Sequence, residues 1–369
     1  MKNFHGYTSC FPRFFWVLVS LLMFVPGSLI AEPAKWKIGI LAPLSGDVAS
    51  WGLDTRRAVE LANEMLGNGQ FELIFEDDVC LGKSAVSAAK KLVEIDHVQF
   101  AMIVCTEPTI ASAPIFERAK VVVVAPGATG SIVTNAGDYI FRTWPSDSKM
   151  AEAVFEYVAA KYKRPATITE MRGFPQEFSR VFLDLAKARG LAVSSEDFQT
   201  GETDFRSLLM KLRAKNPDVL MVSADSERTL LAVVAQVQSL KWKIPLVAQY
   251  IAGTPGFYEK AGSAAEGLVF GDSPDVDCTK DKPGCQVFKE FMRRYGKPQS
   301  TNFMIGSTIA SFMAIAESAR SGKAPKEALY EMSIATPLGE ISFDKNGDVL
   351  GPKHLLRVIK NSQPQVLSE

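Results

Sequence analysis

Histidine and net charge are both scarce in this chain of 369 residues. Only His97 and His354 lie beyond Ala31, and neither has a zinc-ligand spacing to a pair of cysteines. The 41 basic and 41 acidic residues balance, so no excess charge favours nucleic acid or an anionic membrane surface. Serine-elbow and phosphate-loop patterns are missing as well. We therefore expect no catalytic residue, metal, cofactor or nucleic-acid partner.

Long apolar runs are also rare, and the one near the N-terminus is short. It covers Phe14 to Val25 and follows Lys2 and Arg13. Such a run cannot span a bilayer and is typical of a signal-peptide core, with an uncleaved anchor as the alternative. We expect cleavage after Ala31 and export. Cys10 precedes the run, so it cannot be the lipid-carrying cysteine of a lipoprotein.

Four cysteines follow the predicted cleavage site, and export predicts that they form disulfide bonds. Cys278 and Cys285 enclose a short polar loop that a local bridge would close. Cys80 and Cys105 each follow an apolar run that we expect to be a strand, and the two strands would be neighbours. A zinc site is the alternative, but the required histidine spacing is missing.

Short β-rich runs alternate with amphipathic helical segments from Lys37 onward. The valines at 121–124 predict a strand buried on both faces. Repeated strand-loop-helix units predict parallel sheets with helices on both faces. The rhythm breaks where Trp144 and Pro145 force an extended path, and a second series of units follows. We therefore expect an α/β fold with two lobes.

The last quarter of the chain has a different pattern. Residues 283–335 are expected to be mostly helical, and strands are expected at 341–343 and 354–360. Asn346 and Gly347 between these two runs predict a hairpin turn. The acidic residues around the turn lack EF-hand spacing, so we expect a plain turn and no calcium loop.

Polar and aromatic residues follow the carboxyl ends of several predicted strands, where open α/β sheets bind ligands. Each has an equally good structural explanation, such as Thr106 as a helix cap or Trp51 as a hydrophobic staple. Their common location is the better indication of a binding cleft. The positions are Ser45, Trp51, Thr106 and 127–129 in the first lobe, and Phe174, 223–226, Gln249 and Tyr250 in the second.

Several stretches together resemble the periplasmic solute-binding proteins for leucine, isoleucine and valine that serve ABC transporters. These are KIGILAPLSGDVASWG at 37–52, EDDVC at 76–80, PGAT at 126–129, FRTWPSDS at 141–148, TDFRSLLMKL at 203–212, GSAAEGLVF at 262–270 and ISFDKNGD at 341–348. The resemblance covers essentially the whole chain after the leader.

The resemblance implies the type I periplasmic binding protein fold. Two Rossmann-like lobes would close on a ligand like a Venus flytrap. The lobes would comprise 32–143 with 274–336, and 144–273 with 337–369. Three hinge crossings would lie near 142–147, 272–276 and 335–340. A Cys80–Cys105 bridge beside the ligand is also implied, whereas a Cys278–Cys285 bridge is less general in the family.

The resemblance also assigns ligand contacts in the first lobe. Thr106 matches a hydroxyl residue that binds the ligand's carboxylate. Gly127 and Thr129, with Ala128 between them, match a loop that binds the carboxylate and the ammonium. Trp51 matches an aromatic residue that covers the ligand.

The second lobe departs from the family pattern. Phe174, and either Ala224 or Asp225, stand where tyrosines are usual. Tyr250 stands where a glutamate would neutralise the amino group, and a buried ammonium without an anionic partner is costly. Either Asp225 provides the charge, or the ligand is a keto, aromatic or other organic acid. The residues leave both possibilities open.

The function implied is a monomeric, non-enzymatic substrate-binding subunit of an ABC importer in the periplasm. It would deliver a small organic acid or amino acid to permease subunits in the inner membrane. The alternatives are a ligand-sensing subunit for a membrane receptor and an exported enzyme on the same fold.

Overall fold

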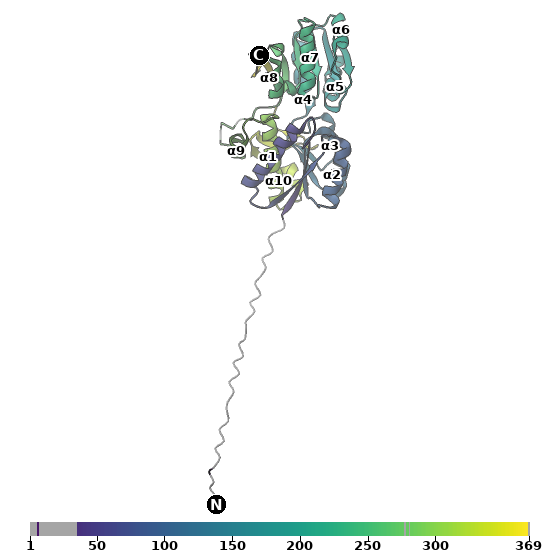
Figure 1. The fold of residues 1–369 in the computed structure, drawn as a ribbon. Coiled ribbons are helices and arrows are strands. Elements are labelled where there is room, and N and C mark those ends of the chain that lie inside the picture. The colour runs from purple at the N-terminus through teal and green to yellow at the C-terminus, as the bar shows by residue number, and fades with distance from the viewer. Residues whose placement is uncertain (1–5, 7–34, 277, 280, 368–369) are drawn as a thin grey trace, which may run out of the picture. The chain divides into compact units, whose positions relative to one another are not determined.

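The computed structural model describes Gly6 and residues 35–276, 278–279 and 281–367. The predicted signal peptide and its cleavage site after Ala31 lie outside these residues, Gly6 excepted. The chain from Lys35 onward forms one compact unit that contains two large sheets (Figure 1). Within the described ranges, every helix is too short or too polar to cross a membrane.

The first sheet has five parallel strands in the order β2-β1-β3-β4-β5. The predicted valine strand is in this sheet and is buried on both faces. We call the part of the chain built around this sheet the first lobe. Its strands are β1 (Trp36–Ala42), β2 (Phe71–Asp77), β3 (Phe100–Ile103), β4 (Val122–Ala125) and β5 (Ile140–Arg142).

Helices cover both faces of the first sheet, as the alternating pattern predicts. One face packs against α1 (Ala49–Leu66), α9 (Cys285–Tyr295) and α10 (Asn302–Arg320). The other face packs against α2 (Gly82–Glu94) and α3 (Thr106–Ala119). Helix α11 (Pro325–Glu331) lies against α10. Nearly all of α10 is buried because its residues are apolar or small on every side.

The second sheet has seven strands in the order β15-β14-β10-β9-β8-β6-β7. The first five strands along the chain are parallel. Strand β14 pairs antiparallel with β10, and β15 pairs antiparallel with β14. We call the part built around it the second lobe. Its strands are β6 (Pro165–Glu170), β7 (Ser194–Phe198), β8 (Val219–Ser223), β9 (Leu246–Ala248), β10 (Val269–Asp272), β14 (Leu355–Lys360) and β15 (Gln363–Val366).

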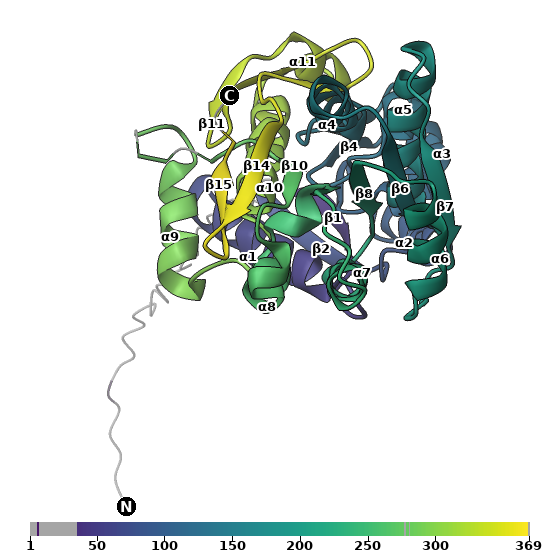
Figure 2. The same cartoon turned by 90° about the horizontal axis from the view of Figure 1, so that it is seen from above.

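The second sheet is also covered on both faces (Figure 2). Helices α4 (Asp147–Lys161) and α5 (Gly173–Ala188) contribute to the core on one face. Helices α6 (Arg206–Ala214), α7 (Glu227–Ser239) and α8 (Pro255–Ala261) contribute to the core on the other face. The structure thus confirms the expected α/β fold.

The predicted hairpin exists, but its second strand is a different one. The turn at Asn346–Gly347 joins β12 (Gly339–Phe343) to β13 (Val349–Leu350), which pair antiparallel beside β11 (Ile334–Thr336). The expected pairing of 341–343 with 354–360 is wrong because β14 pairs with β10 instead. A residue with a side chain could not replace Gly347, because the Cβ atom of that residue would lie 2.2 Å from the carbonyl oxygen of Ile140.

The chain passes between the lobes at segments that lie side by side. His354 lies between two of them, with Nε2 3.1 Å from the carbonyl oxygen of Ser146 and Nδ1 3.3 Å from that of Asp272. Phe343 and Val349 still belong to the core of the first sheet. We therefore propose that the third crossing lies at 351–354, later than the 335–340 expected from the sequence. The other lobe boundaries stay a prediction.

Candidate functional site

A cavity of about 450 Å³ lies between the carboxyl ends of the two sheets. Ala128 and Ala224 are not among its lining residues, because both are fully buried in the cores of their lobes. The other predicted site residues all line it: Trp51, Thr106, Gly127, Thr129, Phe174, Asp225 and Tyr250.

Thr106 and the loop that follows β4 meet in the first-lobe wall of the cavity. The N–H of Gly130 donates to Oγ1 of Thr106 at 3.0 Å. Because that oxygen already accepts a hydrogen bond, the hydroxyl proton of Thr106 is free to be donated to another acceptor. Helix α3 begins at Thr106, so its positive end reinforces the attraction for an anion. The backbone of Gly127 passes close to the residue that follows β3. A Cβ atom at this position would lie only 2.6 Å from the carbonyl oxygen of Val104.

Arg142 holds this loop from behind. Its Nη1 lies 3.3, 3.1 and 2.8 Å from the carbonyl oxygens of Ala128, Thr129 and Gly130. Its Nε donates to Oδ1 of Asp348 in the hairpin turn at 2.6 Å. In a trans peptide unit, the C=O of one residue and the N–H of the next residue point in opposite directions. Because these carbonyls face Arg142, the N–H groups of the residues that follow them face away from it. The Gly130 N–H that meets Thr106 is one of these.

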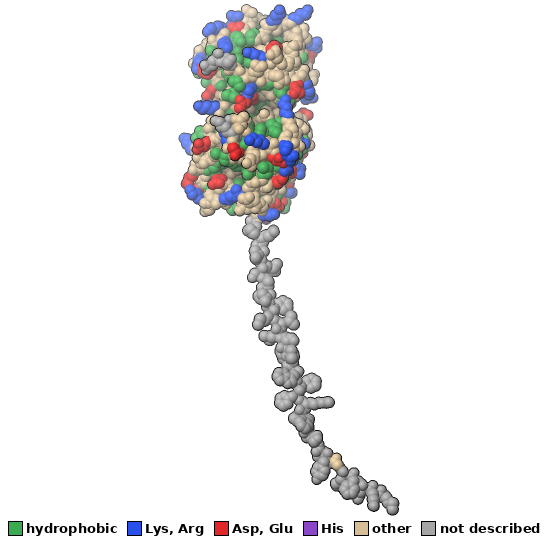
Figure 3. All heavy atoms as spheres, turned by 90° about the vertical axis from the view of Figure 1, so that its left-hand side faces the viewer, with side chains coloured by type: hydrophobic (Ala, Val, Ile, Leu, Met, Phe, Trp, Pro, Cys, Tyr) green, Lys and Arg blue, Asp and Glu red, His purple; other side chains and the backbone are tan. Residues whose placement is uncertain are grey.

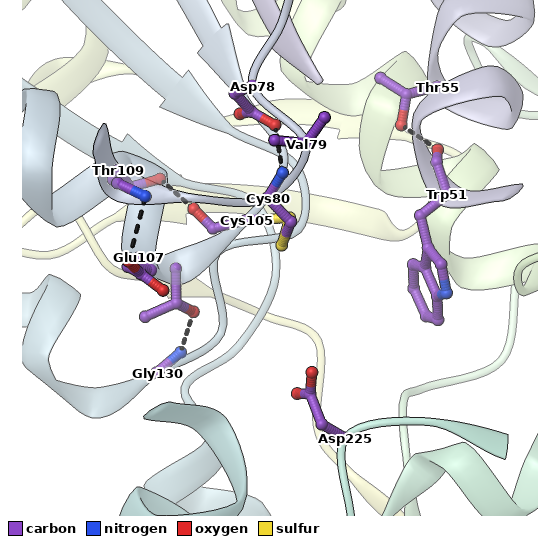
Figure 4. Close-up of a disulfide and its surroundings, with 12 residues drawn as sticks. Trp51, Thr55, Asp78, Val79, Cys80, Cys105, Glu107, Thr109, Gly130 and Asp225 are labelled. Carbon is purple, nitrogen blue, oxygen red and sulfur yellow. Dashed lines mark hydrogen bonds between the residues drawn. A yellow bond between two sulfur atoms is a disulfide. The ribbon is translucent and has the colours of Figure 1, made fainter. Parts of the chain in front are cut away.

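The Cys80–Cys105 disulfide lies in the same wall (Figure 4). It connects the loop after β2 to the start of α3, which carries Thr106. Cys278–Cys285 forms the second bridge, so both predicted pairs are confirmed. The N–H of Cys80 donates to Oδ1 of Asp78 at 2.8 Å. Burial raises the pKa of Asp78 to about 6, against the effect of this hydrogen bond.

Four aromatic side chains form one cluster along the cavity, with Tyr250 at its centre. The Tyr250 ring lies 5.9 Å from Trp51, 5.8 Å from Trp144 and 5.1 Å from Phe174, between ring centroids. Trp51 comes from the first lobe, Phe174 and Tyr250 come from the second, and Trp144 lies in a crossing. Burial raises the pKa of Tyr250 and neighbouring carboxylates add to this, so its hydroxyl is neutral.

An ion pair lies in the second-lobe wall. Nη1 of Arg172 is 3.0 Å from Oδ2 of Asp225, and the two side chains are 29% and 18% exposed. Asp225 is fixed further by its backbone N–H, which donates to Oε2 of Glu170 at 2.9 Å. Burial raises the pKa of Asp225 to about 6, although the Arg172 guanidinium opposes the rise.

Four further polar or aromatic residues line the cavity that were not predicted from the sequence: Trp144, Glu107, Arg172 and Glu177. Arg172 follows β6 just as Asp225 follows β8, so the strand-end rule that found Asp225 applies to it too. Glu177 lies one helical turn into α5, where no such rule applies. Ser131 donates to Glu177 across the cavity, and a hydrogen bond from Arg180 lowers the pKa of Glu177.

Asp147 is a buried carboxylate at the crossing next to the cavity. It is 1% exposed, and a hydrogen bond with the Thr129 side chain favours its charged form and so acts to lower its pKa. Its N–H donates to the carbonyl oxygen of Thr129 at 2.8 Å. Burial raises the pKa of Asp147 to about 7, against the influence of Arg142.

Comparison with known proteins shows similarity over almost the whole described chain. Residues 35–362 match the periplasmic binding protein family. The leucine-specific-binding protein of Salmonella typhimurium is 25% identical over 330 residues, covering 85% of this chain and 88% of the relative. A leucine-, isoleucine-, valine-, threonine- and alanine-binding protein of Pseudomonas aeruginosa is 28% identical, with 85% and 87% covered.

Solved structures share the fold at lower sequence identity. A leucine-binding protein of Thermotoga maritima matches with a TM-score of 0.80 and 22% identity, covering 90% of this chain and 98% of the other. A solute-binding protein of R. palustris in complex with 4-hydroxybenzoate matches with a TM-score of 0.78 and 18% identity, covering 90% and 96%. The chain belongs to the periplasmic binding protein family, as a type I solute-binding protein of the ABC-transporter kind.

Proposed function

We propose that this protein is the substrate-binding subunit of an ABC importer and captures a small carboxylate-bearing ligand in the periplasm. The observation that carries the proposal is the cavity between the lobes, which has hydroxyl and N–H groups in one wall and aromatic rings along its length. The names of the relatives, which describe binding proteins for leucine and related amino acids, support the same class of function.

The first-lobe wall would bind the ligand's carboxylate. Thr106 has a hydroxyl proton to donate, Thr129 lies beside it in the cavity wall, and the positive end of α3 points to the same place. Hydrogen bonds to a carboxylate are stronger than those between neutral groups. These groups would bind any small carboxylate, whatever the rest of the ligand is.

The body of the ligand would pack against the aromatic cluster. Tyr250 provides no charge for an ammonium, and Asp225 is already paired with Arg172. An amino acid would therefore have to compete with Arg172 for Asp225, at a cost in a partly buried site. We infer that an aromatic or other non-amino acid fits better. Two of the structural neighbours were solved with 4-hydroxybenzoate and benzoate, and another with isoleucine.

Closure of the lobes would stabilise the bound state. Trp51 and Tyr250 contact each other across the cavity, and the bond from Ser131 to Glu177 also joins the two lobes. A ligand that contacts both walls favours the closed arrangement by its extra affinity for it. We propose a monomer that binds its ligand without converting it. The closed form would be presented to permease subunits.

A thermal-shift screen followed by calorimetry tests this function. The chain is expressed with its leader and purified from the periplasm, then screened against branched-chain amino acids, keto acids and aromatic acids. We expect at least one carboxylate to raise the melting temperature, because ligand binding stabilises the folded state. No shift with any of these acids would contradict the proposal.

Uptake separates transport from sensing. Deleting the gene for this protein should abolish uptake of the labelled ligand into cells, and a plasmid copy should restore it. Normal uptake in the deletion strain would instead favour a ligand-sensing subunit. Recovery of the ligand unchanged after prolonged incubation with the protein checks that the protein is not an enzyme.

A further inference from the structure

The second-lobe wall places a hydrogen-bond donor and an acceptor side by side in the cavity. Nη1 of Arg172 lies 3.0 Å from Oδ2 of Asp225. A guanidinium carries five N–H donors and a carboxylate accepts at two oxygens, so the contact leaves capacity on both groups. Both side chains are partly exposed, and both line the cavity.

The pair comes from neighbouring strands that fix its position. Arg172 follows β6 and Asp225 follows β8, which are adjacent and parallel. Figure 4 shows the Asp225 carboxylate directed into the space between Gly130 and Trp51. A ligand whose carboxylate lies at Thr106 would therefore present its far end to Arg172 and Asp225.

Charge limits what that far end can be. An ammonium group would be attracted by the carboxylates of the lining, but it would have to displace Arg172 from Asp225 and would be repelled by that guanidinium. A second carboxylate would be repelled by Asp225 and also by Glu107 and Glu177, which line the same cavity. A hydroxyl group is neutral, and it donates one hydrogen bond while accepting another. It is thus the common group that satisfies both members of the ion pair at once.

We propose that Arg172 and Asp225 select a hydroxyl on the ligand at the end remote from its carboxylate. Together with the aromatic cluster, this makes the ligand a ring-hydroxylated aromatic acid. Arg172 donates a hydrogen bond to the hydroxyl oxygen, and the hydroxyl donates a hydrogen bond to the Asp225 carboxylate. No proton is transferred. The inference rests on the proposed function and specifies the ligand class for that same site.

The test compares ligands that differ only at this position. Calorimetry measures 4-hydroxybenzoate, 4-methylbenzoate, benzoate, terephthalate and leucine against the same protein. A site built around a ligand hydroxyl discriminates strongly against the analogue that lacks it. We expect 4-hydroxybenzoate to bind at least about tenfold more tightly than 4-methylbenzoate, because the pair is only partly enclosed.

Substitutions then assign the preference to the pair. Arg172→Met and Asp225→Leu should bring the ratio of the two affinities close to one while 4-methylbenzoate binding is kept. Arg189→Met is the control. Arg189 flanks the end of α5 opposite to Arg172 and forms an exposed ion pair with Glu156, so its loss should leave the ratio unchanged. Thermal unfolding of each variant confirms that it is folded, and Arg172→Lys tests a donor that keeps the charge.

Each outcome decides one of the two claims. Equal binding of 4-hydroxybenzoate and 4-methylbenzoate, tighter binding of leucine or terephthalate, or an unchanged ratio in Arg172→Met would overturn the hydroxyl selection and leave the solute-binding function standing. If none of the acids in the wider screen binds, the proposed function fails and this inference fails with it.

Discussion

The two walls of the cavity are built from different parts of the chain. The first-lobe wall offers backbone N–H groups, a threonine hydroxyl and the start of a helix, and buried Arg142 holds the loop 128–130 from behind. The second-lobe wall offers longer side chains, among them the partly exposed pair of Arg172 and Asp225. Backbone N–H groups would bind the carboxylate group that all such ligands carry. The chemistry of a wall made of side chains changes whenever one of its residues is substituted.

This difference suggests how one fold serves many ligands. The first wall depends on buried contacts that are costly to alter, since removing one partner of a buried charge pair is strongly destabilising. The second wall depends on contacts that are partly exposed and weaker. Figure 3 shows charged side chains of both signs mixed over the face of the described chain that it presents.

The largest expected effect comes from Arg142→Met. The variant should lose about 3–5 kcal/mol of unfolding free energy, because Arg142 is 1% exposed and three carbonyls and the partly exposed Asp348 lose it as a partner. Chemical denaturation measures the loss, and affinity for every carboxylate should fall with it. The matched change Arg172→Met should cost under about 1 kcal/mol of stability. Equal losses of unfolding free energy in Arg142→Met and Arg172→Met would contradict the view that the first-lobe wall depends on more costly contacts than the second-lobe wall.

Removal of the Cys80–Cys105 bridge comes next. Replacing both cysteines by serine should cost about 3 kcal/mol, about 1 kcal/mol more than the same change at Cys278 and Cys285, because the bridged residues are 25 apart instead of 7. Only the first bridge lies in the cavity, so only its loss should weaken ligand binding. Peptide mapping without reductant should first recover Cys80 linked to Cys105. Weaker binding after loss of either bridge would contradict this assignment.

Asp147 tests the crossing that joins the two walls. Its pKa is raised from the ordinary 3.8 to about 7, so between these values the folded protein keeps a proton that the unfolded chain has released. Stability should therefore fall as pH rises through this window and level off above it. Asp147→Asn should remove its share of this dependence, gaining about 1.4 kcal/mol per pH unit relative to the parent between pH 5 and 7. Asp78 and Asp225, whose pKa values are raised to about 6, keep their smaller shares in the variant.

Denaturation series at pH 5, 6, 7 and 8 check this prediction. Asp184→Asn, at a side chain that is 65% exposed on α5, is the matched control and should leave the dependence unchanged. A parent protein whose stability is level across these values would show that Asp147 ionises freely in the fold.

The smallest expected effect sharpens the comparison most. Thr106→Ala should weaken binding by about 1–3 kcal/mol, the cost of one lost hydrogen bond to a charged group. The loss should be the same for 4-hydroxybenzoate, 4-methylbenzoate and benzoate, since all carry the carboxylate. Thr106→Ser keeps the hydroxyl and should restore most of the affinity. A loss confined to the hydroxylated acid would place the ligand in the opposite orientation.

Much of the fold follows from local patterns in the sequence. The valines of β4 and the strand-helix alternation predict parallel sheets because each unit must bury both faces of its strand. The hairpin partner was missed because pairing is decided over long distances. The two-residue strand Val349–Leu350 has almost no pattern of its own, and Leu355–Lys360 is equally suited to either sheet.

The site was predictable wherever it depends on strand ends. Thr106, Gly127, Phe174 and Asp225 all follow strands, and the strands of a parallel sheet bring their ends to one edge. Arg142 and Glu177 were missed as site residues because their roles depend on which distant groups they meet. Ala128 and Ala224 do not line the cavity, because both are fully buried in the cores of their lobes, so a role for them in binding stays a prediction.

The contact between Arg142 and Asp348 also bears on when the protein acquires its activity. The two residues are 206 positions apart in the sequence. A chain folded only as far as β5 contains the loop 128–130 but lacks the counter-ion of the arginine that holds this loop. Any affinity that depends on this loop would therefore develop only after Asp348 has joined the fold, which separates the start of folding from the start of binding.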